Sequence, residues 1–391
     1  MKGTTEVLPF AEIPLVDHHC HSLLVDQPRT VEAYRACFTE SPDGEVPRHH
    51  VAHTVFYRRA IRDLAEFFGC AADEEAVLEA RSRMPFSELV RECFAAANVA
   101  AALVDYGFRP RDHYAPGALA ALLPCRTAPV LRLEALLQEL LPAAPSLASL
   151  QDAFVAAIEE APREGVVAFK TIIAYRSGLA VERHSPEALE AAFQAERAQA
   201  GSGPHRVTAK PLLDAMLWLA LERIAPLELP VQVHAGFGDP DLHLVYANPA
   251  WLRPVFEYPA FRRVRFVLLH SYPYVAEAAW LASVYAHVYV DLSLAVPFLA
   301  HGATQALVDA LAHAPLTKVL YASDAFSIPE LFWLGGLHGR RALDRALRRI
   351  AAEGFLAEEE IPEAAGRILG GNARDLYSLE RANRAEDGPT S

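Results

Sequence analysis

The sequence predicts an α/β protein, a (β/α)8 TIM barrel with a helical insertion after strand 1. Short, almost wholly apolar runs alternate along the chain with alanine-rich stretches, as expected for a parallel sheet buried on both faces. Histidine and aspartate residues end several of these runs. Those positions are the carboxyl ends of the strands, where barrel enzymes carry their active sites.

Eight apolar runs are expected to form the strands. They cover residues 13–17, 101–105, 129–134, 166–174, 229–234, 264–270, 287–291 and 318–324. Eight parallel strands close most simply into a barrel. A doubly wound open sheet is the alternative, and it is disfavoured because no glycine-rich phosphate loop follows the first run.

The stretches between the runs are expected to be helical. After the second strand these helices cover residues 115–123, 147–160, 186–228 with a break at 201–204, 248–258, 274–286, 298–313 and 340–352. Between the first two strands the expected helices are 29–38, 50–69, 73–82 and 86–98. We therefore predict a single domain, residues 1–391, in which residues 24–98 form a helical insertion that lids the pocket.

Composition excludes several classes of partner. The 391 residues carry a net charge of −13, which argues against nucleic acid or an anionic membrane as a partner. No leader-like segment and no apolar run of about 18 residues is found. Five cysteines without paired spacing favour reduced thiols and a cytoplasmic location. A small-molecule substrate is the expected partner, and the alanine-rich helices would permit a homo-oligomer.

Two histidines near the N-terminus could begin a metal site. His19 and His21 follow the first apolar run, and alternate residues of a strand share a face about 7 Å apart along the backbone. Imidazoles at this spacing are suitable ligands for a zinc-class cation, although an isolated pair would fit a surface or capping role equally well. His234, His270 and Asp324 each end another run. Such convergence indicates a metal rather than core packing, because every buried ionisable group needs a partner.

Lys170 has two possible roles. It lies inside the expected fourth strand among apolar or small residues, where an unpaired ammonium would have a depressed pKa. It could contact substrate, or it could form an ion pair with Glu134 or Asp105. Arg132 and Glu134 are themselves expected to form a salt bridge inside the barrel.

Two residues are candidates for binding substrate. Arg176 lies just beyond the fourth strand and could hold a carboxylate through two hydrogen bonds, or it could form an ion pair in a loop. Asp239 follows the fifth strand in the sequence Gly-Phe-Gly-Asp. It could contact substrate or cap the N-terminus of a helix.

These motifs together resemble the amidohydrolase superfamily of metal-dependent hydrolases. The resemblance covers about residues 13–378, and the flanking stretches at 169–178, 234–239, 270–274, 289–293 and 372–377 are similar to the amidohydrolase-like domain that some larger proteins carry fused to a glutamine-synthetase-like domain. It implies that His19, His21, His234 and His270 are metal ligands. It also implies that Asp324 is a ligand and the proton shuttle. In some members of the superfamily a strand-four lysine is carboxylated and bridges two metals, a role that Lys170 would take.

The resemblance implies a metal-dependent hydrolase that cleaves an amide-type C–N bond of a small, carboxylate-bearing substrate. Metal-activated water would attack the carbonyl carbon, with Asp324 and His270 as catalytic groups. The expected cofactor is one or two divalent ions, with zinc favoured and Mn, Fe or Ni able to use the same donors. A metal-dependent decarboxylase or isomerase on the same barrel is one alternative. A non-catalytic interaction or sensing barrel is the other.

Overall fold

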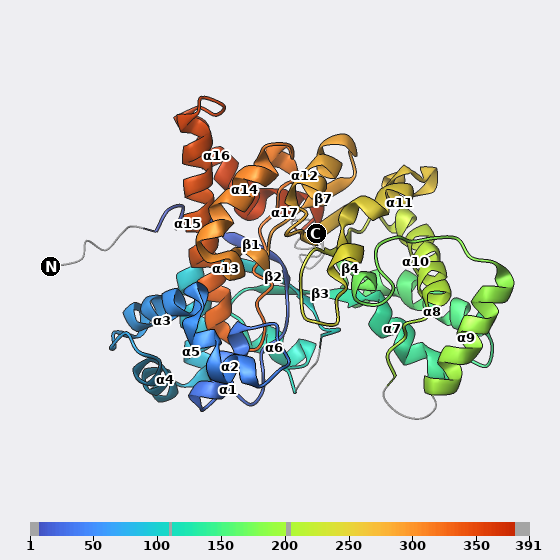
Figure 1. The fold of residues 1–391 in the computed structure, drawn as a ribbon, viewed down its shortest axis with the longest axis horizontal. Coiled ribbons are helices and arrows are strands. Elements are labelled where there is room, and N and C mark those ends of the chain that lie inside the picture. The colour runs from blue at the N-terminus through green and yellow to red at the C-terminus, as the bar shows by residue number, and fades with distance from the viewer. Residues whose placement is uncertain (1–7, 109–111, 201–204, 380–391) are drawn as a thin grey trace, which may run out of the picture.

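Seven parallel strands form a curled half-barrel at the centre of the molecule (Figure 1). The computed structural model describes residues 8–108, 112–200 and 205–379. The strands pair in chain order: β1 (Leu15–Cys20), β2 (Val99–Asp105), β3 (Arg126–Arg132), β4 (Ala168–Thr171), β5 (Val231–Ala235), β6 (Phe266–His270) and β7 (Val288–Val290). All six pairings are parallel, which confirms seven of the eight predicted strands.

The eighth predicted strand, residues 318–324, does not form a regular strand. Its backbone nevertheless lies between β7 and β1: the N–H of Leu320 donates to Val290 O at 3.0 Å, and the N–H of Asp324 donates to His19 O at 3.0 Å. Asp324 has a φ of 52°, outside the extended region that a ladder requires. The turn that aims the aspartate therefore interrupts the strand.

Helices fill the connections. Those between β1 and β2 are α1 (Val31–Arg35), α2 (Glu45–His49), α3 (Val55–Phe68), α4 (Glu74–Arg83) and α5 (Phe86–Ala97). They lie together on one side of the sheet, beside the lower part of α15 (Figure 1). The others are α6 (Pro116–Leu122), α7 (Leu133–Leu140), α8 (Leu147–Glu160), α9 (Pro186–Ala200), α10 (Lys210–Ile224), α11 (Arg253–Glu257), α12 (Val275–Val284), α13 (Ala295–Leu299), α14 (Ala303–Leu311), α15 (Pro329–Ala352), α16 (Ile361–Gly366) and α17 (Asn372–Leu376). Within the described part of the chain, none is both long and apolar enough to cross a membrane.

Helix α15 begins at Pro329, eleven residues before the predicted start. Glycines at 335, 336 and 339 lower the helix propensity of this stretch, which is why the sequence places the start too late. The structure shows why small residues are needed here. A Cβ on Gly335 would lie 3.0 Å from Ser323 Cβ, and one on Gly339 would lie 2.8 Å from Tyr321. The glycines let α15 pack closely against the segment that carries Asp324.

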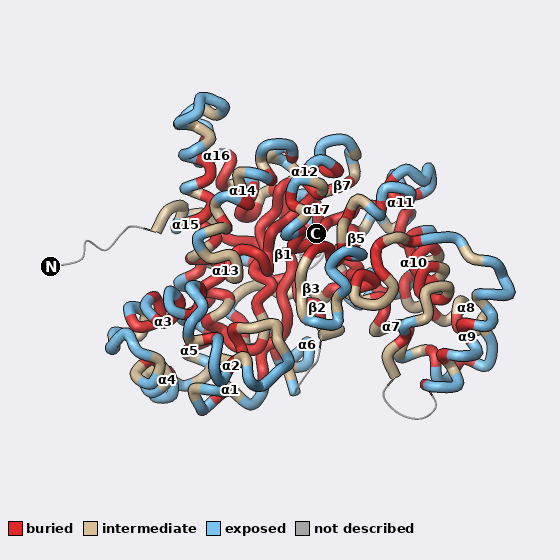
Figure 2. The backbone as a smooth tube through the Cα atoms, viewed as in Figure 1, coloured by how far each residue is buried: buried red, intermediate tan, exposed pale blue. Residues whose placement is uncertain are grey.

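The core has an inner and an outer part. Side chains of alternate strand positions, including Val16, Leu103, Val130 and Val267, form one cluster with Tyr377. A much larger cluster joins the other strand faces to the surrounding helices. The strands accordingly run through the most buried region (Figure 2), and the sheet gives rigid support to the residues at its carboxyl end.

Candidate active site

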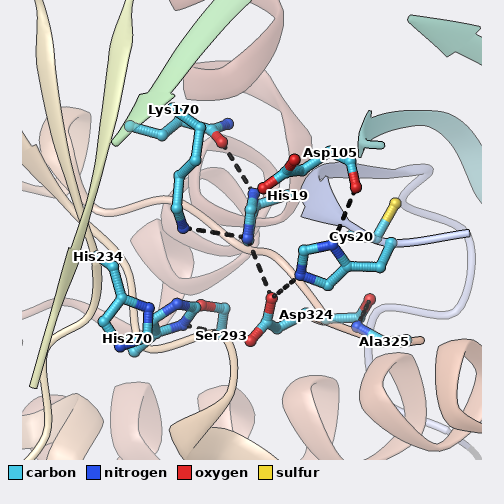
Figure 3. Close-up of polar contacts among 12 residues, drawn as sticks. His19, Cys20, Asp105, Lys170, His234, His270, Ser293, Asp324 and Ala325 are labelled. Atoms are coloured by element: carbon cyan, nitrogen blue, oxygen red, sulfur yellow. Dashed lines mark hydrogen bonds and ion pairs between the residues drawn. The ribbon is translucent and has the colours of Figure 1, made fainter. Parts of the chain in front are cut away.

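Two histidines and an aspartate meet at the carboxyl ends of the strands (Figure 3). Asp324 Oδ1 lies 3.1 Å from His19 Nε2 and 3.3 Å from His21 Nε2. The pairing register between β1 and β2 shifts between Asp17 and Cys20, an irregularity of the kind that re-aims strand side chains. His19 and His21 reach the same cavity, as predicted, whereas Cys20 packs into a separate apolar cluster with Leu23 and Phe94.

Hydrogen bonds fix the tautomers of both histidines. Gln232 donates through Nε2 to His18 O at 2.6 Å, so its Oε1 is the acceptor for His19 Nδ1 at 2.8 Å. His21 Nδ1 lies 3.0 Å from the carbonyl oxygen of Asp105, which can only accept. Both Nδ1 atoms are therefore donors. In the neutral rings Nε2 carries the lone pair that faces Asp324.

The donor set fits a divalent cation. Asp324 Oδ1 is buried without a hydrogen-bond partner, and the Nε2 atoms of His19 and His21 are the ring nitrogens nearest to it. Burial lowers the pKa of His19 to about 3, so the ring is neutral at pH 7. Burial alone would raise the pKa of Asp324, but His270, His19 and His21 hold it well below its usual value. Neutral imidazoles around an ionised carboxylate are the protonation states that a metal requires.

His270 joins this group through a turn at the end of β6. Its φ is 64°, and His270, His19 and Asp324 all offer ligand atoms within 4.8 Å of one another. Ser293 Oγ donates to Asp291 Oδ1 at 2.8 Å, so His270 Nδ1, 2.7 Å from the same Oγ, is the donor of that pair. The same Nδ1 lies 3.6 Å from Asp324 Oδ2, and the lone pair of the neutral ring is on Nε2.

His234 lies beside the cluster rather than in it. Its ring centroid is 4.4 Å from that of His270, and its Nε2 is 3.2 Å from Phe237 O. Among the described residues, none of the metal-sized groups includes His234. The structure thus brings His19, His21, His270 and Asp324 together, while His234 would have to give up its contact with Phe237 to bind the same ion through Nε2.

Lys170 contacts the cluster directly. Its Nζ lies 3.3 Å from His19 Nε2, and burial lowers the pKa of this lysine to about 8. Neither predicted partner forms an ion pair with it in the described structure. Asp105 accepts instead from Arg132 Nε at 2.9 Å, and Glu134 accepts from the N–H of Ile172 at 2.9 Å.

The predicted salt bridge between Arg132 and Glu134 is wrong. The physical reason is that β3 ends at Arg132 and α7 begins at Leu133, so Glu134 belongs to a helix and not to the strand. Its carboxylate binds Thr171 and the backbone just after β4. It therefore supports the strand that carries Lys170.

A cavity of about 280 Å³ is lined by His19, His21, His270 and Asp324. Arg176 and Asp239, the predicted substrate-binding residues, both line it. Arg176 Nε is buried without a hydrogen-bond partner, and burial together with the nearby Arg206 lowers the arginine pKa to about 10. Burial also raises the pKa of Asp239. Sequence reasoning missed further polar and aromatic lining residues: Glu40, Phe108, Tyr175, Arg206, Asp241 and Phe326.

Comparison with known proteins decides the family. A family model described as amidohydrolase matches residues 143–379, and the protein fluG of Emericella nidulans is 30% identical over 94% of this chain. The chain belongs to the amidohydrolase family. It spans 46% of the length of fluG.

Solved structures agree with this assignment. A Lactobacillus casei protein to which a metal-dependent hydrolase activity has been ascribed is 30% identical, with a TM-score of 0.85 over 95% of this chain and 96% of its own. Uronate isomerase of Thermotoga maritima shares the fold, with a TM-score of 0.63 at 14% identity over 94% of this chain and 95% of its own. The amidohydrolase fold thus extends over nearly the whole chain.

A second group of possible ligands lies outside the amidohydrolase site. Glu182, His184 and Asp214 have ligand atoms within 4.8 Å of one another. Lys210 Nζ lies 2.7 Å from Asp214 Oδ2, and His184 Nε2 lies 2.8 Å from the same oxygen. Because a lysine already occupies this carboxylate, the group is a local ion-pair network and a poor metal site.

The neutral state of His19 predicts a measurable pH dependence. Its folded pKa of about 3 lies below the unfolded value of about 6.5. Between these limits the unfolded chain binds more protons, and stability falls as the pH falls. In His19→Gln with EDTA present, the loss of unfolding free energy between pH 7.5 and pH 5.5 should be smaller than in the wild type by about 1.4 kcal/mol. Urea titrations at the two pH values measure the unfolding free energy. His49→Gln, a change at an exposed histidine, is the control. Equal losses in the wild type and in His19→Gln would contradict a neutral His19 in the folded protein.

Proposed function

We propose that this amidohydrolase is a metal-dependent hydrolase that cleaves the C–N bond of a small, carboxylate-bearing amide. The observation that supports it most is the convergence of His19 Nε2 and His21 Nε2 on Asp324 Oδ1, at 3.1 and 3.3 Å, while the Nδ1 of each ring donates elsewhere. In the neutral rings these three atoms are all acceptors, and a cation among them would satisfy them together. Zinc is the favoured ion for imidazole and carboxylate donors.

His19, His21, His270 and Asp324 would hold the cation, with His234 and Lys170 as the further ligands that a second ion would need. When bound, the cation lowers the pKa of a coordinated water to about 7 and polarises the scissile carbonyl. Asp324 would take a proton from the attacking water and pass it to the leaving nitrogen as the C–N bond breaks. Arg176 would bind the substrate carboxylate and fix the distance between it and the scissile bond.

Two features of the scaffold belong to the same proposal. Residues 319–325, hydrogen-bonded on one side to β7 and on the other to β1, would complete the barrel as its eighth segment. The helices within residues 24–98 would cover its mouth, since Glu40 of this segment lines the cavity. Water excluded from the cavity would strengthen the contacts of Arg176 and Asp324 with substrate.

A decarboxylase or an isomerase would use the same groups. Arg176 would then hold a carboxylate beside a reacting C–C or C–O centre, and Asp324 would move a proton. The fold is shared with a uronate isomerase, and fold alone does not select a reaction.

The product of the reaction separates these possibilities. We expect the zinc-loaded protein, given a panel of N-acyl amino acids and amino-acid amides in H2¹⁸O, to release an amine or ammonia and to incorporate one ¹⁸O atom into the new carboxylate. Mass spectrometry of the products measures this. Release of CO2, or an isomerised product with no hydrolytic ¹⁸O, would refute hydrolysis.

A further inference from the structure

Glu40 is a half-buried acid that the proposed reaction does not use. It follows the short 3-10 turn Ala36–Phe38 in the segment between β1 and β2, and it lines the same cavity as Asp324. Its Oε1 is buried and has no hydrogen-bond partner. A buried carboxyl oxygen without a partner costs free energy, so this position is best explained by a ligand that completes it.

The surroundings of Glu40 are acidic. Burial, followed by the charges of Asp324 and Asp239, raises its pKa to about 8. Among the described residues, no cation forms an ion pair with Glu40: Arg132 pairs with Asp105 and Arg206 with Asp241. The Glu40 carboxyl group is therefore not neutralised by a side chain of the protein itself.

The cavity also has an unsatisfied cationic group. Arg176 Nε is buried without a partner, and the contact of its Nη2 with Gln138 Oε1 is long, at 3.4 Å. One small cavity thus presents a carboxyl oxygen, Glu40 Oε1, and a guanidinium nitrogen, Arg176 Nε, that each lack a hydrogen-bond partner. A ligand with one negative and one positive group would satisfy both, whereas a simple carboxylate would leave Glu40 unpaired.

We propose that Glu40 is a specificity-determining residue that binds a protonated amine of the substrate, while Arg176 binds its carboxylate. The substrate class is then an amino-acid derivative that keeps a free ammonium and a free carboxylate, with the scissile C–N bond directed toward Asp324. The identity of the cleaved bond rests on the proposed function. The recognition of the ammonium group by Glu40 does not rest on it, because binding can be measured without any reaction.

Binding of matched probes tests the role of Glu40. The probes are L-glutamate against glutarate and L-aspartate against succinate, two pairs that differ by one ammonium. Isothermal titration calorimetry of the zinc-loaded protein is expected to show that one aminated probe binds at least about tenfold more tightly than its partner. Glu40→Gln, nearly identical in shape, is expected to remove that preference and leave the affinity for the simple dicarboxylate unchanged.

Controls separate recognition by Glu40 from other causes. Glu45→Gln, in the same segment but exposed and paired with Arg48, should keep the wild-type preference, and thermal unfolding of both variants checks that they are folded. An amine preference that survives in Glu40→Gln would arise from the metal and would overturn the proposal, as would the absence of any preference in the wild type. The binding ratios need no turnover. A wild type that fails to hydrolyse amides but keeps the preference therefore refutes only the hydrolase assignment.

Discussion

Asp324→Asn is expected to lower kcat by about a thousandfold while the fold stays intact. Asparagine keeps the shape of the side chain and can still offer one oxygen to a cation, but it cannot take up the proton that must move from water to the leaving nitrogen. The Asp324 carboxylate is held ionised by His270, His19 and His21, so the wild-type enzyme has this base ready at neutral pH. Steady-state kinetics on the best amide of the panel measures the effect.

The change must be separated from loss of the metal. Metal content by mass spectrometry should stay within about threefold of the wild type when the Asp324→Asn protein is assayed with saturating zinc. Asp309→Asn, on the exposed face of α14 where Asp309 accepts from Gln305, is a matched control and should keep wild-type kcat. Full activity in Asp324→Asn would remove this residue from the chemistry.

Lys170→Met is expected to have the second largest effect, a loss of at least about a hundredfold in kcat. Methionine fills the buried volume, but it cannot be carboxylated and cannot bind an ion next to His19. If Lys170 bridges two ions, the wild-type protein should bind two equivalents of zinc when loaded with bicarbonate present, and one in CO2-free buffer. The variant should bind one under both conditions.

Lys318→Met tests whether any lost lysine would give the same result. Lys318 donates to the carbonyl oxygens of Ala282 and Tyr285, away from the cavity lining, so its replacement should leave metal stoichiometry and kcat unchanged. Wild-type activity together with two equivalents of zinc in Lys170→Met would show that this lysine is neither a bridging ligand nor a substrate contact.

Strand positions could be predicted because the apolar runs are long and continuous. The runs at 229–234 and 264–270 became β5 and β6 with shifts of one or two residues at their ends. The last run, residues 318–324, is the exception: it does not form a regular strand, because its backbone turns at Asp324. A φ of 52° there depends on the hydrogen bond from the Asp324 N–H to His19 O, a tertiary contact that no local pattern contains.

The site could be predicted only in part, because alternation along a strand is visible in the sequence, whereas a turn at the end of a strand is not. His19 and His21 share a face by simple alternation, whereas His270 reaches the cluster through a left-handed turn with φ 64°. Its position at the end of a run was visible in the sequence, but its orientation was not. Glu40 carries no such signal. It lies in an irregular stretch after Ala36–Phe38, and only the folded chain brings it into the cavity.

Anomalous diffraction from crystals of the zinc-loaded protein tests the central claim most directly. The account predicts a peak at the zinc edge about 2.0–2.2 Å from His19 Nε2, His21 Nε2 and an Asp324 oxygen. A second peak beside Lys170 would identify a two-ion site. Zinc found only at Glu182, His184 and Asp214, with no anomalous signal at the carboxyl ends of the strands, would contradict it.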